Sequence, residues 1–360
     1  MPPSRKRKRR NIVPPKRKIV IDMLSHATSA PAQGVGSAYL EQKALIEDFG
    51  KDDFEVMVNQ STRKADIVHV HSVNPGFYFK MNKKTLSVCY VHFLPETLKG
   101  SIRLPRPIFS LFCRYVVSFY KRAKKLVVVN PCFIEPLKKL GIQEENITYI
   151  PNFVDERLFH QVTYERKFAL RKLYDIPEDR FVVIGVGQVQ TRKGVLDFLK
   201  VAEENPDIFF LWLGGFSFKA ITDGYAELKK EMEKKRENVR FVGIVEREKM
   251  PDYYALSDLF FLPSFNELFP MSLLEACSVG IPYLVRDLEL YRPILLGDYF
   301  KAADVSSFSK TIRELSKDKE KYSEGLDLSK RIREKYCRKS VYRLWKQYYL
   351  GLVTEKVTLK

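Results

Sequence analysis

Two glutamates eight positions apart are the strongest chemical signal in the sequence. Glu267 follows a predicted buried strand (258–264), and Glu275 lies about one turn into the predicted helix 270–279. In open parallel sheets ligands bind at the carboxyl ends of the strands, and helix N-termini favour phosphate groups. Two carboxylates at this spacing can accept hydrogen bonds from two sets of hydroxyls on one nucleotide sugar. Two solvated glutamates are the alternative, but the proline and small residues around them favour a binding site.

A second motif, GVGQVQTRKGVLDFL (185–199), contains a strand end, a glycine turn and the start of a helix. Glycine lets the backbone approach a ligand closely, and Lys193 supplies a point charge that can neutralise a diphosphate. Two other donor-binding candidates belong to this motif: Gln188 in the glycine turn and Arg192 directly before the lysine. Two more, Gly243 and Ile244, lie near the end of the later predicted strand 239–245.

Further candidates follow predicted strands in the first half of the chain. In AQGVGSAYLEQ (32–42) two glycines precede a helix, so Gly36 can bring the backbone to a phosphate, with an ordinary strand–turn–helix as the alternative. His92 ends a predicted strand and is a candidate catalytic residue, although a lone histidine on a strand is more often structural. His71 also ends a strand, and lining an acceptor cleft or packing in the core are equally good interpretations. The sequence shows no cluster with metal-ligand spacing, so no metal is expected.

All of these residues follow short apolar strands that alternate with helical stretches. Such alternation predicts an α/β fold whose parallel sheets are covered on both faces. The pattern occurs twice, which predicts a basic disordered tail at 1–17, a Rossmann-like domain at 18–160 and a second one at 161–334. The helical, aromatic-rich segment 335–360 is expected to pack back onto the first domain.

Positive charge is concentrated in the first part of the chain. The 360 residues carry a net charge of +18, and residues 1–150 hold 26 lysines and arginines against 12 aspartates and glutamates. The expected partner is therefore anionic, either nucleic acid or a membrane leaflet. A nucleic-acid-binding protein predicts a recognisable module or aromatic residues interleaved with basic ones on strands, and the sequence has neither. We therefore expect no nucleic-acid partner.

The cysteines and the hydropathy indicate a cellular compartment. The five cysteines are scattered and form no Cys-x-x-Cys pair, which indicates free thiols in a reducing environment. No apolar run approaches the roughly eighteen residues needed to span a bilayer, and the N-terminus has no apolar signal-peptide core. A cytoplasmic protein is therefore expected.

A predicted amphipathic helix within residues 103–125 is the candidate membrane-binding element. Its aromatic and aliphatic residues fall on one face, and its basic residues fall on the opposite face. A core-packed helix with a solvated basic face is the alternative, but the charge excess of this half favours an anionic leaflet. The predicted membrane-binding residues are Arg106, Phe112, Arg114, Phe119, Lys121 and Lys125.

The segment from Glu267 to Glu275 resembles the E-x7-E signature of family 4 of the retaining glycosyltransferases. That family has the GT-B fold, in which two Rossmann-like domains face each other across a cleft. In the family the first glutamate contacts the donor sugar and the second binds the nucleotide ribose. The resemblance therefore gives these roles to Glu267 and Glu275, and it places the backbone amides of Met271 and Ser272 near the diphosphate.

The resemblance also assigns roles to residues of the other motifs. Gly36 approaches the donor phosphate from the first domain, and His92 bonds the 6-hydroxyl of the donor sugar near the reacting carbon. Family members usually carry Gly-Arg-Leu followed by Lys-Gly, with both cations on the diphosphate. This sequence keeps the lysine at Lys193, where it stabilises the departing charge, but it has Gln188 in place of the arginine. Arg192 is the candidate replacement.

The runs QGVGSAYLEQ, VHFLPETLKGS and GQVQTRKG are similar to bacterial diacylglycerol-glycolipid synthases of this family, over nearly the whole chain after residue 18. The resemblance is greatest to the diglucosyl- and galactosylglucosyl-diacylglycerol synthases. It implies transfer of glucose or galactose from UDP-glucose or UDP-galactose to monoglucosyldiacylglycerol, with retention and without a cofactor. The product would be a dihexosyldiacylglycerol that anchors lipoteichoic acid.

The same resemblance implies a peripheral enzyme at the cytoplasmic face of the cell membrane, in contact with anionic lipids. Two other acceptors remain open at this point. One is diacylglycerol itself, which would receive the first sugar, and the other is a soluble or cell-wall acceptor used by a sister enzyme with the same donor site.

Overall fold

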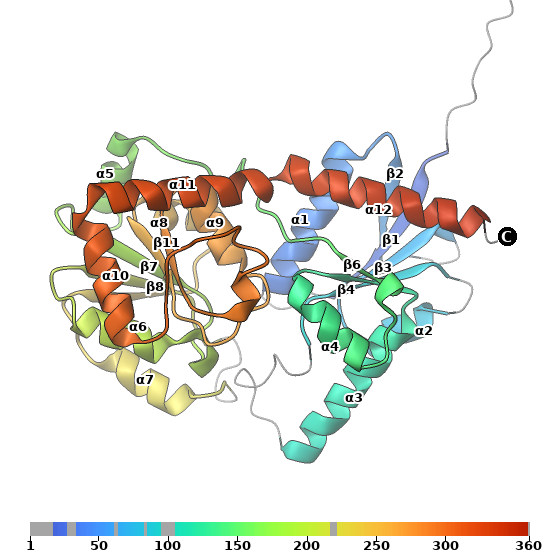
Figure 1. The fold of residues 1–360 in the computed structure, drawn as a ribbon, viewed down its shortest axis with the longest axis horizontal. Helices are drawn as coiled ribbons and strands as arrows, with labels where there is room; N and C mark the ends of the chain where they lie inside the picture. The colour runs from blue at the N-terminus through green and yellow to red at the C-terminus, as the bar shows by residue number, and fades with distance from the viewer. Residues whose placement is uncertain are drawn as a thin grey trace, which may run out of the picture.

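The strands of the chain gather in two sheets that occupy opposite halves of the molecule (Figure 1). The structure is a computed structural model, and it describes residues 17–26, 34–60, 64–82, 85–94, 105–216 and 222–358. Within these ranges each sheet has six strands, and all the strand pairs are parallel. The predicted α/β fold with two parallel sheets is therefore confirmed.

The first sheet has the strand order β2-β1-β3-β4-β5-β6. Its central strands β3 and β4 are buried along their whole length, because helices cover both faces, and they therefore read as continuous apolar runs. The strands are β1 (Ile19–Leu24), β2 (Phe54–Val58), β3 (Ile67–Val70), β4 (Ser87–Val91), β5 (Lys125–Val128) and β6 (Ile147–Tyr149). The helices between them are α1 (Gly34–Phe49), α2 (Pro75–Lys80), α3 (Arg106–Arg122) and α4 (Ile134–Lys139).

The second sheet is doubly wound, with the strand order β12-β11-β10-β7-β8-β9. The chain enters at β7, builds outward to β9 and then returns to β10 on the other side, so the switch point lies between β7 and β10. The strands are β7 (Val182–Val186), β8 (Phe209–Leu213), β9 (Val239–Gly243), β10 (Leu259–Leu262), β11 (Tyr283–Arg286) and β12 (Lys301–Ala302). The helices are α5 (Tyr164–Leu173), α6 (Val195–Glu203), α7 (Tyr225–Glu233), α8 (Met250–Ala255), α9 (Met271–Val279), α10 (Val305–Lys317) and α11 (Lys319–Lys335).

The last helix, α12 (Arg338–Thr358), leaves the second unit and covers the first. It continues the line of α11 along the same side of the molecule (Figure 1) and packs against α1. Trp345 and Tyr349 of this helix are fully buried in the first core. The Tyr349 hydroxyl lies 2.8 Å from His69 Nδ1 and accepts a hydrogen bond of 3.0 Å from Gln42. The C-terminal helix is thus a structural part of the first unit.

The chain crosses between the two units twice, and the two crossings lie side by side. Val154, on the outward crossing, pairs with Cys337 on the return as an isolated parallel bridge. The Val154 amide donates to the Tyr336 carbonyl over 3.3 Å. The segments that join the two units are therefore hydrogen-bonded to each other.

Three histidines lie buried close together at the carboxyl side of the first sheet. The rings of His69 and His71 are 4.2 Å apart, and those of His71 and His92 are 6.0 Å apart. Burial lowers the pKa of His69 and of His92 to about 3, and burial lowers the pKa of His71 well below its usual range. All three imidazoles are therefore neutral at neutral pH.

These histidines predict a loss of stability on acidification. In the unfolded chain a histidine titrates near pH 6.5, so between pH 6.5 and pH 3 the unfolded state binds more protons than the folded state. Above pH 6.5 these histidines are neutral in both states and do not lower the free energy of unfolding. At pH 5.5 each such histidine lowers it by about 1.4 kcal/mol. Urea unfolding at a series of pH values measures this slope. His69→Phe should reduce this slope, and a slope equal to that of the wild type would contradict the assignment.

Candidate active site

The two predicted glutamates lie at the carboxyl edge of the second sheet, beside its switch point. Glu267 is in the loop after β10, and α9 begins at Met271. Pro270 occupies the N-cap position and makes no side-chain capping bond. Because the first N–H groups of a helix have no intrahelical partner, the amides of Met271 and Ser272 are available to an anionic ligand at this end.

Lys193 and Glu267 form a buried ion pair. The lysine ends the short 3-10 helix η6 (Thr191–Lys193) between β7 and α6, and its Nζ lies 2.5 Å from Glu267 Oε1. Arg192 Nη1 lies 3.8 Å from Glu267 Oε2 and donates to the Asn266 carbonyl over 2.5 Å. The side chains of Glu267 and Lys193 are only 6% and 12% exposed. Two loops far apart in the sequence therefore place two cations around one carboxylate.

The charge of Glu267 is stabilised by these neighbours. Burial raises the pKa of this carboxyl, but Lys193 and Arg192 outweigh burial and hold the pKa below its usual range. Glu267 is therefore ionised at neutral pH and can accept hydrogen bonds from sugar hydroxyls. A buried charge without such partners costs several kcal/mol, so the cations are needed to keep the carboxylate in this position.

Gly194 allows the lysine loop to approach the end of β10. Its φ is +70°, in the left-handed region, and a Cβ at this position would lie 2.3 Å from the Pro263 carbonyl oxygen. Any other residue would be strained at this φ and would force this loop or the end of β10 to shift. The glycine after the lysine thus allows the loop conformation in which the ion pair forms.

The remaining predicted donor-site residues of this domain line neighbouring strand ends. Gln188 follows β7 and accepts a hydrogen bond from Gln190. Gly243 ends β9, and its carbonyl accepts a hydrogen bond of 2.8 Å from the Gly214 amide after β8. Ile244 follows and is largely exposed. These residues share the sheet edge at which Glu267 lies.

Glu275 is held by two side chains that the sequence analysis did not identify. Its Oε2 accepts a hydrogen bond of 2.8 Å from the Tyr254 hydroxyl of α8, and its Oε1 accepts one of 3.1 Å from Arg247 Nη1. Arg247 begins the 3-10 helix η8 (Arg247–Lys249). Burial raises the pKa of Tyr254 well above its usual range, so the phenol remains a donor. Neither residue carries a local signal, because Arg247 starts and Tyr254 lies near the end of a stretch that reads as an ordinary short helix.

The first domain reaches this site through residues that follow its own strands. Asn130, after β5, donates 2.9 Å hydrogen bonds to the carbonyls of Leu268 and Leu290, and Asn152, after β6, donates one of 3.4 Å to Phe269. The carboxyl edges of the two sheets therefore face each other next to the loop of Glu267. The asparagine contacts were also missed, since they join residues more than a hundred positions apart.

His92 and Gly36 lie on the first-domain side. His92 follows β4, the neighbour of β5 in the sheet, and its ring is buried and neutral. Within the described residues its Nε2 has no hydrogen-bond partner. A neutral imidazole in this position can exchange a hydrogen bond with a hydroxyl but cannot act as a cation. Gly36 belongs to the first turn of α1.

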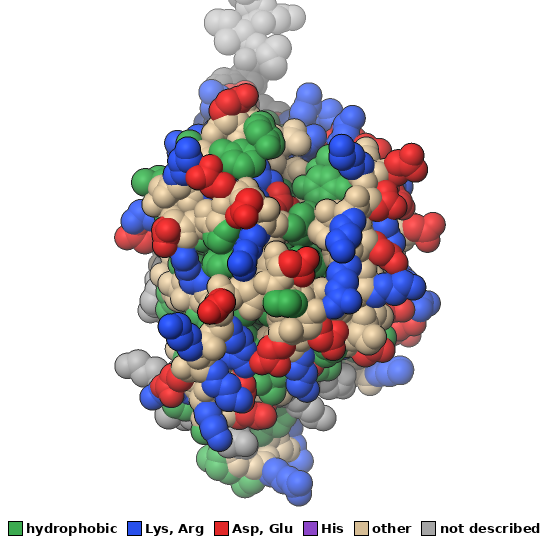
Figure 2. Space-filling view, turned by 90° about the vertical axis from the view of Figure 1, so that its left-hand side faces the viewer, with side chains coloured by type: hydrophobic (Ala, Val, Ile, Leu, Met, Phe, Trp, Pro, Cys, Tyr) green, Lys and Arg blue, Asp and Glu red, His purple; other side chains and the backbone are tan. Residues whose placement is uncertain are grey.

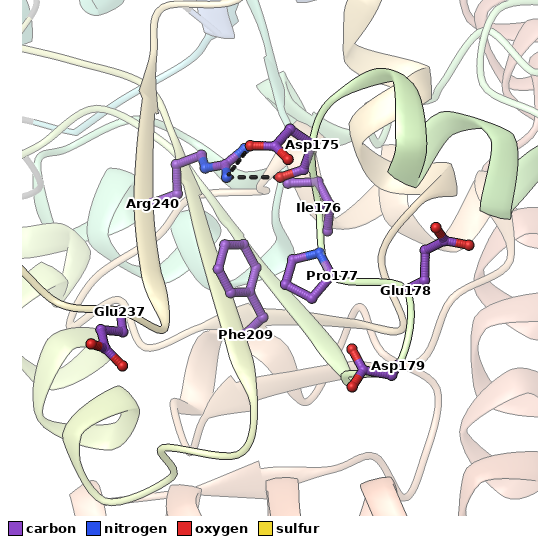
Figure 3. A pocket seen from close by; sticks show the side chains of 8 residues that line it. All are labelled: Asp175, Ile176, Pro177, Glu178, Asp179, Phe209, Glu237 and Arg240. Carbon is purple, nitrogen blue, oxygen red and sulfur yellow. Dashed lines mark hydrogen bonds and ion pairs between the residues drawn. The ribbon is translucent and has the colours of Figure 1, made fainter.

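An open pocket of about 560 Å³ lies elsewhere on the second domain (Figure 3). Phe209, the first residue of β8, and Asp179, shortly before β7, place it at the amino edge of the sheet. Arg240 donates a 2.8 Å hydrogen bond to the Asp175 carbonyl beside it. This pocket is on the opposite edge from the glutamates and is not part of the candidate site.

The structure corrects part of the predicted membrane-binding face on α3. Phe119 is fully buried, because the C-terminal half of the helix packs into the first core. Lys125 lies on β5 rather than on the helix, and its ammonium donates to the Glu145 carbonyl. Phe112 is half-buried against the core. The assignment of Phe119 is therefore wrong, and Lys125 is not part of the helical basic face, whereas the predicted basic residues Arg106, Arg114 and Lys121 are exposed.

The apolar surface that α3 does expose is near its N-terminus. Ile108 and Leu111 are 54% and 70% exposed, and this end of the helix projects from the body of the domain (Figure 1). No helix in the part of the chain that the structure describes is long and apolar enough to cross a bilayer.

Each of the two domains matches a known protein family. Residues 54–158 match the family model Glycosyltransferase Family 4, and residues 167–334 match the model Glycosyl transferases group 1. The chain is 41% identical over 341 residues to the alpha-galactosylglucosyldiacylglycerol synthase of Streptococcus pneumoniae, covering 94% of this chain and 91% of that protein. The chain belongs to glycosyltransferase family 4.

A more distant relative agrees with this assignment, and a solved structure shares the fold. The glycosyltransferase is 25% identical over 258 residues to the processive diacylglycerol alpha-glucosyltransferase of Acholeplasma laidlawii, covering 72% of this chain and 75% of that one. The crystal structure of Anabaena Alr3699/HepE in complex with UDP and glucose superposes with a TM-score of 0.73 at 15% identity, covering 92% of this chain and all of the other. The predicted GT-B fold and glycosyltransferase activity are thus confirmed.

The geometry around Glu275 makes a prediction for this glycosyltransferase. Glu275→Gln keeps an oxygen for the Tyr254 hydroxyl but replaces the carboxylate that is predicted to accept hydrogen bonds from the ribose hydroxyls. Each hydrogen bond to a charged group contributes about 1.5–3 kcal/mol, so UDP should bind at least about tenfold more weakly. Titration calorimetry with UDP measures the change, and the exposed Glu246→Gln is the matched control. Unchanged UDP affinity with an unchanged melting temperature would contradict the role of Glu275.

Proposed function

We propose that this enzyme transfers glucose or galactose from a UDP-sugar to monoglucosyldiacylglycerol, with retention at the anomeric carbon. The observation that carries the proposal is the ionised, buried Glu267 held by Lys193 and Arg192 at the switch point of the second sheet. With Glu275 eight residues later, this loop and helix offer one carboxylate to the sugar, one to the ribose and a helix N-terminus to the diphosphate.

The proposed reaction breaks the bond between the anomeric carbon and the diphosphate oxygen. The acceptor hydroxyl forms the new bond on the same face of the sugar, and its proton passes to the departing phosphate oxygen. Lys193, Arg192 and the amides of Met271 and Ser272 stabilise the negative charge that develops on UDP. Because the chain supplies this positive charge itself, the proposed reaction proceeds without a bound metal or other cofactor.

By their names, the Streptococcus pneumoniae relative makes a diacylglycerol glycolipid and the Acholeplasma relative glucosylates diacylglycerol, and this similarity supports a lipid acceptor. The 41% identity to a synthase of a galactosylglucosyl lipid favours addition of the second sugar. The proposed product is a dihexosyldiacylglycerol, the kind of glycolipid that anchors lipoteichoic acid. First-sugar transfer to diacylglycerol is the second candidate, favoured by the similarity to the Acholeplasma enzyme.

We further propose that the enzyme binds the cytoplasmic face of the cell membrane through the N-terminal half of α3. Ile108 and Leu111 provide an exposed apolar edge, and Arg106 and Arg114 provide charge for anionic headgroups. The outer end of the second domain carries no such basic surface among its described residues, because basic and acidic side chains are intermixed over it (Figure 2).

Transfer of radiolabelled sugar tests the proposed reaction. UDP-glucose and UDP-galactose are offered in parallel with diacylglycerol or monoglucosyldiacylglycerol in mixed micelles that contain anionic lipid. We expect lipid product from monoglucosyldiacylglycerol with one of the two donors. Product from diacylglycerol alone would place the enzyme one step earlier, and hydrolysis of UDP-sugar without lipid product would remove the lipid acceptor from the proposal.

Vesicle sedimentation tests the proposed membrane surface. Each basic residue near an anionic leaflet contributes about 1 kcal/mol, so Arg106→Glu with Arg114→Glu should weaken binding to phosphatidylglycerol-containing vesicles by at least about tenfold. Ile108→Ser with Leu111→Ser should also weaken binding, because the apolar edge is lost. Leu173→Ser, an equally exposed site on the second domain, is the control. Full binding by both double variants would contradict the assignment to α3.

A further inference from the structure

Arg247 contacts three separate parts of the chain at the interface between the domains. Its Nη1 donates to Glu275 Oε1 of α9 over 3.1 Å, and its Nη2 donates to Glu41 Oε1 of α1. The guanidinium also lies 5.2 Å from the ring centre of Phe159, on the connection between the domains. One side chain therefore joins the predicted ribose-binding carboxylate to a helix of the other domain.

The two carboxylates depend on this arginine. Glu41 and Glu275 are only 8% and 5% exposed, and buried carboxylates are costly without a cation. The second oxygen of Glu41 has no hydrogen-bond partner within the described residues, so its ion pair with Arg247 is its compensation there. The planar guanidinium offers separate N–H groups to two carboxylates at once, whereas the compact ammonium of lysine acts as a single point charge.

The arginine also fixes the orientation of Glu275. Arg247 binds one carboxylate oxygen and the Tyr254 hydroxyl binds the other. A carboxylate accepts about four hydrogen bonds, so acceptor positions remain on both oxygens for the two hydroxyls of a ribose. Glu275 is thus held in place before any nucleotide binds.

The other arm of Arg247 binds α1 through Glu41. This helix runs from Gly34 to Phe49 and begins at the glycine-rich turn that contains Gly36, the predicted first-domain contact to the donor phosphate. When the domains separate, Glu41 must leave Arg247. Closure would restore this contact, with the start of α1 next to the donor domain.

We propose that Arg247 is a positioning residue that couples nucleotide binding at Glu275 to closure of the first domain over the donor. The inference rests on the proposed UDP-sugar site. Because coupling between two sites is reciprocal, a change at Glu41 must alter UDP affinity although Glu41 belongs to the opposite domain.

A double-mutant cycle tests this coupling, with UDP binding measured by titration calorimetry in the absence of acceptor. Arg247→Met should weaken UDP binding by about tenfold or more, and Glu41→Gln by about three- to tenfold. In the Arg247→Met background, Glu41→Gln should cause no further change. Lys249→Met on the same short helix and Glu47→Gln on α1 are the exposed controls, and both should leave UDP affinity unchanged.

Thermal unfolding of every variant separates coupling from loss of fold. If Arg247→Met lowers the melting temperature below the range of the titrations, the same cycle with Arg247→Lys replaces it, and lysine should not restore the dependence on Glu41. Additive effects of the two substitutions, or a Glu41→Gln protein that binds UDP as the wild type does, would overturn the inference while leaving the donor site intact. A wild-type protein that does not bind UDP would overturn the proposed function and this inference together.

Discussion

The need to compensate buried negative charge organises the interface between the two domains. Glu267, Glu275 and Glu41 are all largely buried there. Burying a carboxylate is costly unless cations and hydrogen-bond donors are brought to it, and none of the cations here comes from the carboxylate's own helix or loop. Lys193, Arg192 and Arg247 stand on loops that follow β7 and β9. The positions of these loops are therefore tied to the positions of the glutamates.

A parallel sheet makes this convergence possible. The carboxyl ends of all its strands lie on one edge, so loops after β7, β8, β9 and β10 reach a common place although the sequence separates them widely. The first sheet presents its own carboxyl edge to the same place, and Asn130 and Asn152 join the two edges by hydrogen bonds to backbone carbonyls. Side-chain amides suit this position because they satisfy carbonyls without adding charge.

Sequence patterns predicted the elements well and the long-range contacts poorly. The alternation of strands and helices predicted both sheets, and the motifs after the strands named Glu267 and Lys193, which the structure joins in an ion pair. Arg247 was missed because its partner Glu41 is 206 positions away and nothing local marks either residue. Phe119 was misassigned for a related reason. Helical periodicity reports that a face is apolar, but it does not report whether a neighbouring core or another surface covers that face.

The paired crossings at Val154 and Cys337 restrict how the two domains move. Two hydrogen-bonded connections at one place allow rotation about that place far more readily than sliding or twisting of one domain along the other. Displacement during such a rotation grows with distance from the axis. Asn152 lies two residues from Val154 and bonds to the Phe269 carbonyl. A rotation about the paired crossings would therefore displace this contact little and the distant loop tips most.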